Sequence, residues 1–157
     1  MLPDNWKEHA VAQAVEAFDG DALCGGKLEL GELTLEIAPA KIASICGFLK
    51  YDQKFIRLST VTAVDRYPAE PRFEVVYHLH SIERNERVRL KCRLPGTDPQ
   101  IESVTSVWRS ANWYERETFD LFGIRFLNHP DLRRIMLPDD WEGHPLRKDY
   151  PVTGSRV

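Results

Sequence analysis

The chain contains 157 residues, with 21 Lys and Arg against 24 Asp and Glu, so its formal net charge at pH 7 is −3. Hydrophobic residues make up 43% and charged residues 29%, which is typical of a soluble globular domain. The composition lacks the basic excess of a free-standing nucleic-acid-binding protein, and no window reaches the roughly 18 apolar residues of a membrane-spanning helix. The first residues have neither the basic nor the apolar region of a secretory signal, so we expect none.

The chain has three cysteines, Cys24, Cys46 and Cys92, which lie far apart in the sequence. An odd number at such wide spacing predicts reduced thiols rather than a disulfide framework. An iron–sulfur cluster held by this chain alone would need about four Cys ligands. We therefore expect that the chain does not hold a redox cofactor of this kind.

The first third of the chain predicts the order helix, strand, helix. Apolar residues recur at helical spacing over residues 6–18, which predicts an amphipathic helix that Gly20 ends. Residues 21–30 predict a loop or a weak first strand. Strict alternation of apolar and polar residues over 33–37 predicts a half-buried strand, and Pro39 is then well placed to begin a second helix.

The middle of the chain predicts a β-sheet. Residues 55–64 are rich in β-branched side chains, residues 73–80 place Phe73, Val75, Tyr77 and Leu79 on one face, and residues 88–94 alternate apolar and polar residues with a period of two. The polar residues 83–86 between the last two strands predict a reversal of the chain. We expect an α+β fold whose antiparallel or mixed sheet has about four strands, with helices on one face and the other face at least partly solvated.

The polar side of this sheet holds two features that we weigh as possible sites. His78 and His80 lie two residues apart on one strand, so both face the same side, but a zinc site needs three or four protein ligands and the spacing suggests no third. We therefore favour solvated or partner-facing histidines. A basic row follows on the next strand, formed by Arg87, Arg89, Lys91 and Arg93. Such a row is usually a solvated face, and docking to another protein is the alternative.

Two helical segments are predicted after the sheet. Asp98 and Pro99 predict the start of the first, whose apolar stripe extends to Trp108. Ser110 begins the second, which ends at Gly123 because a residue without a side chain tolerates the left-handed conformation found after a helix.

The last 34 residues have a different character. They contain four prolines, which prevent long helices and central strands, and yet too many apolar residues for a disordered linker. We predict a core domain of residues 1–123 and an extended C-terminal tail of residues 124–157. The tail is expected to lie over a surface, either that of its own domain or that of a partner.

The densest group of charges lies at residues 115–120 of the second helical segment, and the tail supplies cations soon afterwards. Neighbouring carboxylates repel each other, so they need a cation or a shared proton. Three interpretations compete: an acid–base site formed by Glu117, Asp120 and His129, a metal site that lacks the Glu-x-x-His spacing, and an ion-pair network that fixes the helix to the tail or to another subunit. Interleaved aromatic residues and arginines favour the last interpretation, because interface cores use them.

Several segments of the C-terminal third resemble the hallmark of one protein family. They are Glu115-Arg116-Glu117-Thr118-Phe119-Asp120-Leu121-Phe122-Gly123, His129-Pro130, Arg133-Arg134-Ile135-Met136-Leu137-Pro138, Trp141 and Pro145-Leu146-Arg147-Lys148-Asp149-Tyr150-Pro151. The family is the C subunit of NADH–quinone oxidoreductase, respiratory complex I, which is also met in related membrane-bound hydrogenases. The resemblance extends from about Trp108 to Pro151, and the residues before it share only the general order of elements.

This resemblance implies a small α+β subunit in the peripheral arm of a membrane complex that passes electrons from NADH to quinone. It implies no cofactor in this chain, with FMN, iron–sulfur clusters and quinone held by partner subunits. The implied partners are other complex I subunits, chiefly the D subunit, with the B and I subunits, and neither nucleic acid nor direct membrane contact is implied. The implied location is the cytoplasmic side of the inner (plasma) membrane, and the implied role is to hold subunits together without catalysis.

The resemblance also assigns interface or stabilising roles to residues of these segments. They are Glu115, Arg116, Glu117, Asp120, Gly123, His129, Arg133, Arg134, Arg147, Lys148 and Asp149. It assigns no catalytic residue and no metal or cofactor ligand to the chain. Two other hypotheses stay open: the same structural role in a related hydrogenase or ferredoxin-linked complex, and a stand-alone acid–base enzyme.

Overall fold

The computed structural model describes residues 5–153, so the first four residues of the predicted core domain and the last four of the predicted tail lie outside the described residues. The predicted first helix is divided in two. A 3-10 turn, η1 (Asn5–Glu8), precedes α1 (Ala10–Phe18). Between them, Nδ1 of His9 accepts a hydrogen bond of 3.2 Å from the amide of Val11, which satisfies one of the free amides at the start of α1.

Five strands form one mixed sheet, one strand more than expected, and the predicted α+β class is confirmed. The strands are β1 (Leu23–Glu29), β2 (Glu32–Ile37), β3 (Arg57–Asp65), β4 (Phe73–Ser81) and β5 (Glu86–Leu94). Their spatial order is β1-β2-β5-β4-β3, in which β2 and β5 are parallel and the other pairs antiparallel. The weak-strand alternative for residues 21–30 is the correct one, because β1 covers most of that segment.

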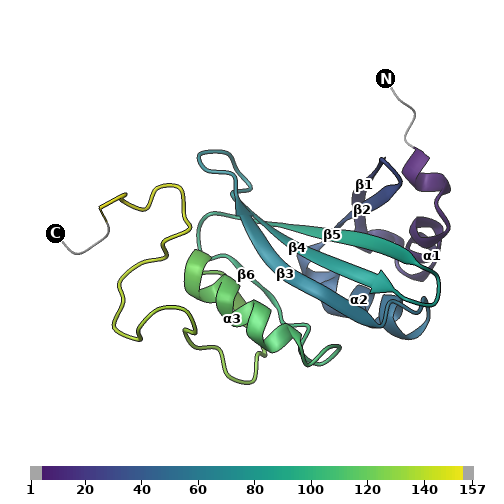
Figure 1. Ribbon diagram of the computed structural model, residues 1–157. Helices are drawn as coiled ribbons and strands as arrows, with labels where there is room; N and C mark the ends of the chain where they lie inside the picture. The colour runs from purple at the N-terminus through teal and green to yellow at the C-terminus, as the bar shows by residue number, and fades with distance from the viewer. Residues whose placement is uncertain (1–4, 154–157) are drawn as a thin grey trace.

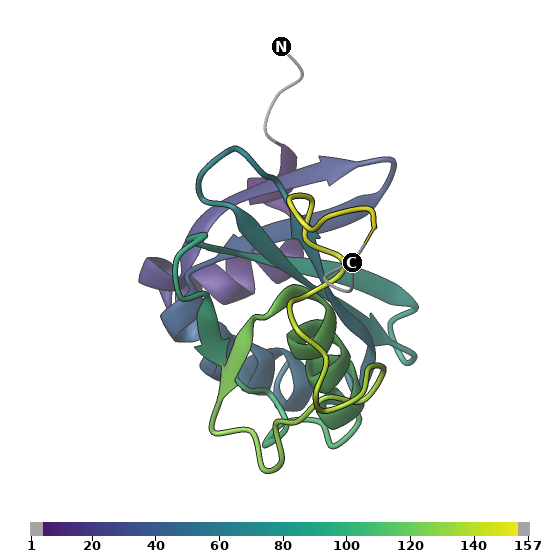
Figure 2. The same cartoon turned by 90° about the vertical axis from the view of Figure 1, so that its left-hand side faces the viewer.

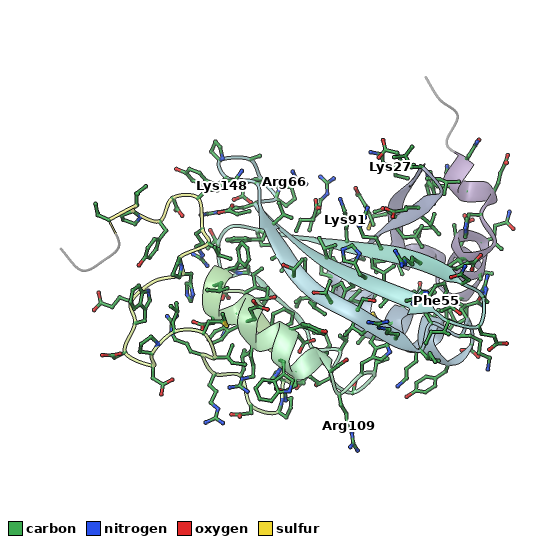
Figure 3. The ribbon with its side chains drawn as sticks, in the orientation of Figure 1. Lys27, Phe55, Arg66, Lys91, Arg109 and Lys148 are labelled. Carbon is green, nitrogen blue, oxygen red and sulfur yellow. The ribbon has the colours of Figure 1, made fainter. Side chains whose placement is uncertain are left out.

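The helices cover one face of this sheet (Figure 1). After a short turn η2 (Gly20–Ala22) and the hairpin of β1 and β2, the turn η3 (Pro39–Lys41) leads into α2 (Ile42–Tyr51). The alternating strand residues supply the core on this side: Leu33, Leu35, Phe73, Val75, Tyr77, Leu79, Leu90 and Leu94. No helix of the described part of the chain lies over the opposite, polar face, on which Lys91 stands (Figure 3).

The helix predicted from Asp98 to Trp108 is wrong. Residues Gln100–Glu102 form a short strand, β6, which pairs in parallel with β7 (Arg125–Leu127), and turns follow up to residue 110. The amide of Arg125 donates to the carbonyl of Pro99 at 3.0 Å. The segment therefore finds its hydrogen-bond partners about 25 residues later in the chain, and its apolar residues are buried all the same.

The helix α3 (Ala111–Phe122) lies where predicted and packs against β3. The predicted tail divides into two parts. Ile124 and Phe126, on and beside β7, are buried in the core, whereas residues 128–153 contain no helix or strand and are called the C-terminal segment below. Figure 2, turned from Figure 1, shows this segment passing in front of α3 and the end of the sheet.

Candidate functional site: the anchored C-terminal segment

The site begins at the C-terminal end of α3, where Gly123 adopts a left-handed conformation with φ of 75°. Its amide donates to the carbonyl of Phe119 at 2.8 Å and closes the last turn. A Cβ atom at this position would also lie 2.6 Å from Nη2 of Arg147 and 2.6 Å from Cδ2 of His144. Glycine is therefore required twice, once for the backbone angle and once for the close approach of the C-terminal segment.

Asp120, whose side chain is fully buried, joins α3 to the C-terminal segment. One carboxylate oxygen accepts 2.7 Å from Nη1 of Arg134, and the other accepts from the three consecutive amides of residues 135–137 at 3.1, 2.7 and 2.9 Å. Burial pushes the pKa of Asp120 upward, but the three amides and the guanidinium together outweigh it and hold the pKa below its ordinary value. The carboxylate is thus an ionised anchor for a stretch of backbone that forms no regular structure.

The C-terminal segment also occupies the free carbonyls at the end of α3. Nδ1 of His144 donates to the carbonyl of Asp120 at 2.9 Å, the amide of Leu146 donates to the carbonyl of Leu121 at 3.0 Å, and Nε of Arg147 donates to the carbonyl of Phe122 at 2.6 Å. Arg134 spans the same region, because its Nη2 donates to the carbonyl of Gly143 at 3.1 Å. Cationic side chains at a helix C-terminus interact favourably with the helix dipole as well as with these carbonyls.

A second anchor ties the segment to the loop between β3 and β4. Arg72 donates two hydrogen bonds of 2.9 Å to the carboxylate of Asp65 and a third, of 2.7 Å, to Asp149. The amide of Lys148 donates to Asp65 at 2.8 Å, and Figure 3 shows Lys148 near Arg66, the residue after Asp65. The Arg72 hydrogen bonds hold the pKa of Asp65 well below its usual range, against the opposing effect of burial.

Glu115 and His129 form a third, buried contact. The Glu115 carboxyl accepts from Oγ of Ser103 at 2.6 Å and from the amide of Val104 at 2.8 Å, yet burial raises its pKa to about 7. Nε2 of His129 lies 3.9 Å from this carboxyl, but it donates to the carbonyl of Asn112 at 3.2 Å while Nδ1 accepts from the amide of residue 131. This arrangement is that of a neutral imidazole, in keeping with the lowering of its pKa by burial, so the two side chains do not form an ion pair.

The side chains of four residues singled out from the sequence contribute little to these anchors. Arg116 is buried, stacks over the ring of Trp113 and donates to the carbonyl of Arg133 at 3.3 Å. The side chain of Arg133 is exposed and pairs with the neighbouring Asp131. Glu117 and Lys148 are exposed and, within residues 5–153, their side chains form no ion pair or hydrogen bond.

The residues of the acid–base alternative do not converge. Asp120 is occupied by four donors at the end of α3, His129 contacts the beginning of α3, and Glu117 faces solvent. For the metal alternative, the described part of the chain contains no group of three or more His, Cys, Asp or Glu residues arranged to hold an ion, and this includes His78 and His80.

Sequence reasoning missed three residues that build the site: Asp65, Arg72 and His144. Asp65 ends β3 directly opposite Phe73, the first residue of β4. Arg72 directly precedes Phe73 in the chain, so its side chain can reach Asp65. A hairpin with an acid at the end of one strand and an arginine just before the next was the signal that would have found this pair. Nothing near His144 in the sequence indicates that it meets the carbonyl of Asp120.

Around these anchors the site exposes apolar side chains. Met136 is 62% exposed, Leu146 51% and Trp113 61%. The backbone that carries Met136 and Leu146 is held by Asp120 and the end of α3, so these side chains are presented from a fixed position. None of the helices in residues 5–153 is long and apolar enough to cross a membrane.

Comparisons with known proteins agree on one family. Residues 35–156 match the family model of the respiratory-chain NADH dehydrogenase 30 kDa subunit. The chain is 54% identical over 125 residues to the C subunit of NADH-quinone oxidoreductase from Geobacter sulfurreducens, covering 79% of this chain and 77% of that protein. It is 47% identical over 155 residues to the corresponding C subunit from Cereibacter sphaeroides, covering 98% of this chain and 76% of that protein.

Two solved structures have the same fold. A trypsin-resistant fragment of Nqo5 aligns with a TM-score of 0.67 and 31% identity, covering 76% of this chain and 97% of the fragment. A chain of the membrane-bound sulfane sulfur reductase, an archaeal respiratory membrane complex, aligns with a TM-score of 0.79 and 26% identity, covering 93% of this chain and 86% of that one. The chain therefore belongs to the family of the respiratory-chain NADH dehydrogenase 30 kDa subunit, which includes the bacterial proteins named as the C subunit of NADH-quinone oxidoreductase.

Proposed function

We propose that this chain is a non-catalytic structural subunit in the peripheral arm of an NADH-quinone oxidoreductase, and that its C-terminal segment docks on partner subunits. Family membership and the identity to the bacterial C-subunit proteins support the assignment to this complex. In this proposal the electron path from NADH through FMN and iron–sulfur clusters to quinone lies in the partners. The protein is peripheral, on the cytoplasmic side of the membrane, and contacts chiefly the D subunit, with the B and I subunits.

One observation carries the docking role: irregular backbone with exposed apolar side chains is anchored by buried charges. Ordering a residue costs about 1–2 kcal/mol of conformational entropy, so a segment that is already ordered can bind a partner without that cost. Asp120 alone immobilises three successive amides, and Met136 lies in the middle of them. Electron transfer between subunits requires fixed distances, and a rigid docking segment serves that requirement.

The experiment that tests this role changes the exposed side chains and leaves the anchors intact. In the intact complex, the double variant Met136→Ser/Leu146→Ser is expected to lower the amount of assembled complex several-fold on native gels, while turnover per assembled complex stays close to normal. The same variant of the isolated chain should unfold within about 0.5 kcal/mol of the parent, because both side chains are more than half exposed.

A companion variant, Asp120→Ala, releases the anchor itself and should lower assembly in the same way. Glu16→Ala, an exposed residue of α1 at the other end of the molecule, is the matched control and should assemble normally. If Met136→Ser/Leu146→Ser and Asp120→Ala both assembled normally but abolished turnover, the result would contradict a structural role and favour a catalytic one.

The second candidate is the same structural role in a related membrane-bound complex that does not use NADH. The TM-score of 0.79 to a chain of the sulfane sulfur reductase complex favours it, because that alignment extends over 93% of this chain. The subunits that co-purify with this chain distinguish the two candidates. A flavoprotein that oxidises NADH in the purified complex supports the first, and its absence together with a different electron-input subunit supports the second.

A further inference from the structure

The polar face of the sheet contains a hollow of about 480 Å³ that lies across β2, β3, β4 and β5. It is remote from the anchors of the C-terminal segment. Three arginines line it, Arg57, Arg87 and Arg89, and Glu32 is the only carboxylate among the lining residues of the described chain. His78 and His80, which form no metal site, line it as well.

The strand register arranges these side chains in two parallel rows. Arg57, His80 and Arg87 stand opposite one another on β3, β4 and β5, and Thr60, His78 and Arg89 form the adjacent row. Residues three apart on a regular strand point to opposite faces, but an irregularity between Leu58 and Thr60 brings Arg57 and Thr60 to the same face. Side chains directly opposite lie about 5 Å apart at Cβ, so Arg57 and Arg87, with His80 between them, lie two strand spacings apart.

The basic side chains of β5 outside the hollow have carboxylate partners, whereas two of the three arginines that line the hollow have none among the described residues. Outside it, Arg93 pairs with Glu36 at 2.9 Å and Lys91 with Glu74 at 3.1 Å. Inside it, Arg89 pairs with Glu32 at 3.2 Å, but Arg57 and Arg87 have no carboxylate within 4.0 Å in residues 5–153. Two uncompensated guanidinium groups therefore flank His80, in a chain whose net charge is −3.

We propose that this hollow binds an extended acidic segment of a neighbouring subunit, with carboxylates on Arg57 and Arg87. Charge complementarity indicates carboxylates, and the spacing indicates a peptide. Adjacent strands lie about 4.8 Å apart, so the two arginine positions are separated by roughly 10 Å, a span that two acidic side chains of one extended peptide match better than one small anion does. The inference rests on the proposed function, because the acidic segment belongs to another subunit of the same complex.

The first test is carbodiimide cross-linking in the intact complex, which joins a lysine amine to a carboxylate with loss of water. The variants Arg57→Lys and Arg87→Lys place an amine at either end of the row, and Arg93→Lys is the control, because Glu36 lies beside it and should give an internal cross-link. We expect mass spectrometry to show that Lys at 57 and 87 joins Asp or Glu of one partner segment. Co-assembly without such cross-links, while the control reacts, would overturn this inference and leave the proposed function standing.

The second test uses the full isolated chain and three probes: a Glu-containing extended peptide, inorganic phosphate, and phosphatidylcholine vesicles containing phosphatidylglycerol. The peptide should bind about tenfold more weakly to the Arg57→Gln/Arg87→Gln variant at low salt and should bind Arg93→Gln with nearly unchanged affinity. Phosphate binding as tight as that of the peptide would show a small-anion site. Vesicle binding that the double variant loses would show a lipid site, and either result would overturn the proposal.

Discussion

Two buried acidic residues on α3, Glu115 and Asp120, respond to burial in opposite ways. Asp120 has four donors, including a guanidinium, and its pKa lies below the ordinary value. Glu115 has two neutral donors, Ser103 and the amide of Val104, which do not offset its desolvation, so its pKa rises to about 7. The number and charge of the donors therefore decide which buried carboxyl stays ionised.

The raised pKa of Glu115 predicts that the free energy of unfolding depends on pH through this residue. Because the folded pKa exceeds the unfolded value of 4.5, the folded state binds the proton more tightly, and stability is lost as the pH rises from about 4.5 through about 7. The free energy of unfolding of the parent, relative to Glu115→Gln, should fall by on the order of 2 kcal/mol between pH 5 and pH 8. Urea unfolding of both proteins at the two pH values measures it, since histidines common to both cancel. Parallel pH profiles would show that Glu115 is ionised throughout.

At the scale of the element, α3 is the part of the site that local sequence predicts best. Its end at Gly123 follows from the glycine alone, because a left-handed residue after a helix is a local requirement. The segment at residues 99–108 has equally helical signals but becomes β6 and turns, because Pro99 and Ser103 pair with Arg125 and Leu127. No local window of the sequence contains those partners.

The variant Gly123→Ala tests the double role of this glycine. The left-handed backbone should cost about 1–2 kcal/mol, and the new methyl group would displace Arg147 and His144. We expect trypsin to cleave the C-terminal segment at Arg133, Arg147 or Lys148 several-fold faster. Gly47→Ala is the matched control, since that glycine lies inside α2 with no atom within 4 Å of the added Cβ, and it should be neutral or stabilising. Equal cleavage rates for both variants would count against the close approach.

For the whole molecule, the C-terminal segment is held by carboxylates rather than by an apolar core. Asp65 and Asp120 are buried and Asp149 is partly exposed, and hydrogen bonds hold the pKa of each below its ordinary value of 3.8. A lowered folded pKa gives stability that is present above about pH 3.8 and is lost as the pH falls through the folded values. The segment and the core should therefore respond differently to acid.

We expect acid to release the C-terminal segment before the sheet unfolds. Hydrogen-exchange protection factors of the amides of Ile135, Met136, Leu137 and Lys148, which donate to Asp120 and Asp65, should fall about tenfold or more between pH 5 and pH 2.5. The central amides of β4 and β5 should keep their protection over that range. Simultaneous loss of protection everywhere would mean that the segment and the core are one cooperative unit.

The sequence by itself determined the α+β class, the strands of the central sheet, α3 and the family resemblance. These features depend on local periodicity, on a terminal glycine such as Gly123, or on motifs read directly from the chain. It also placed the charged residues of α3 and the tail in one cluster, because carboxylates and cations so close in sequence need one another.

Only the tertiary structure decided which partners those charges take. Asp120 binds Arg134 and the amides after it, Arg72 joins Asp65 to Asp149, and Glu115 takes Ser103 in place of a cation. The rows of basic residues on the open face likewise depend on register and on a bulge in β3. The physical reason is the same in each case: the electrostatic and hydrogen-bonding partner is set by distance in space, and chain folding brings together residues such as 72 and 149 that no sequence window spans.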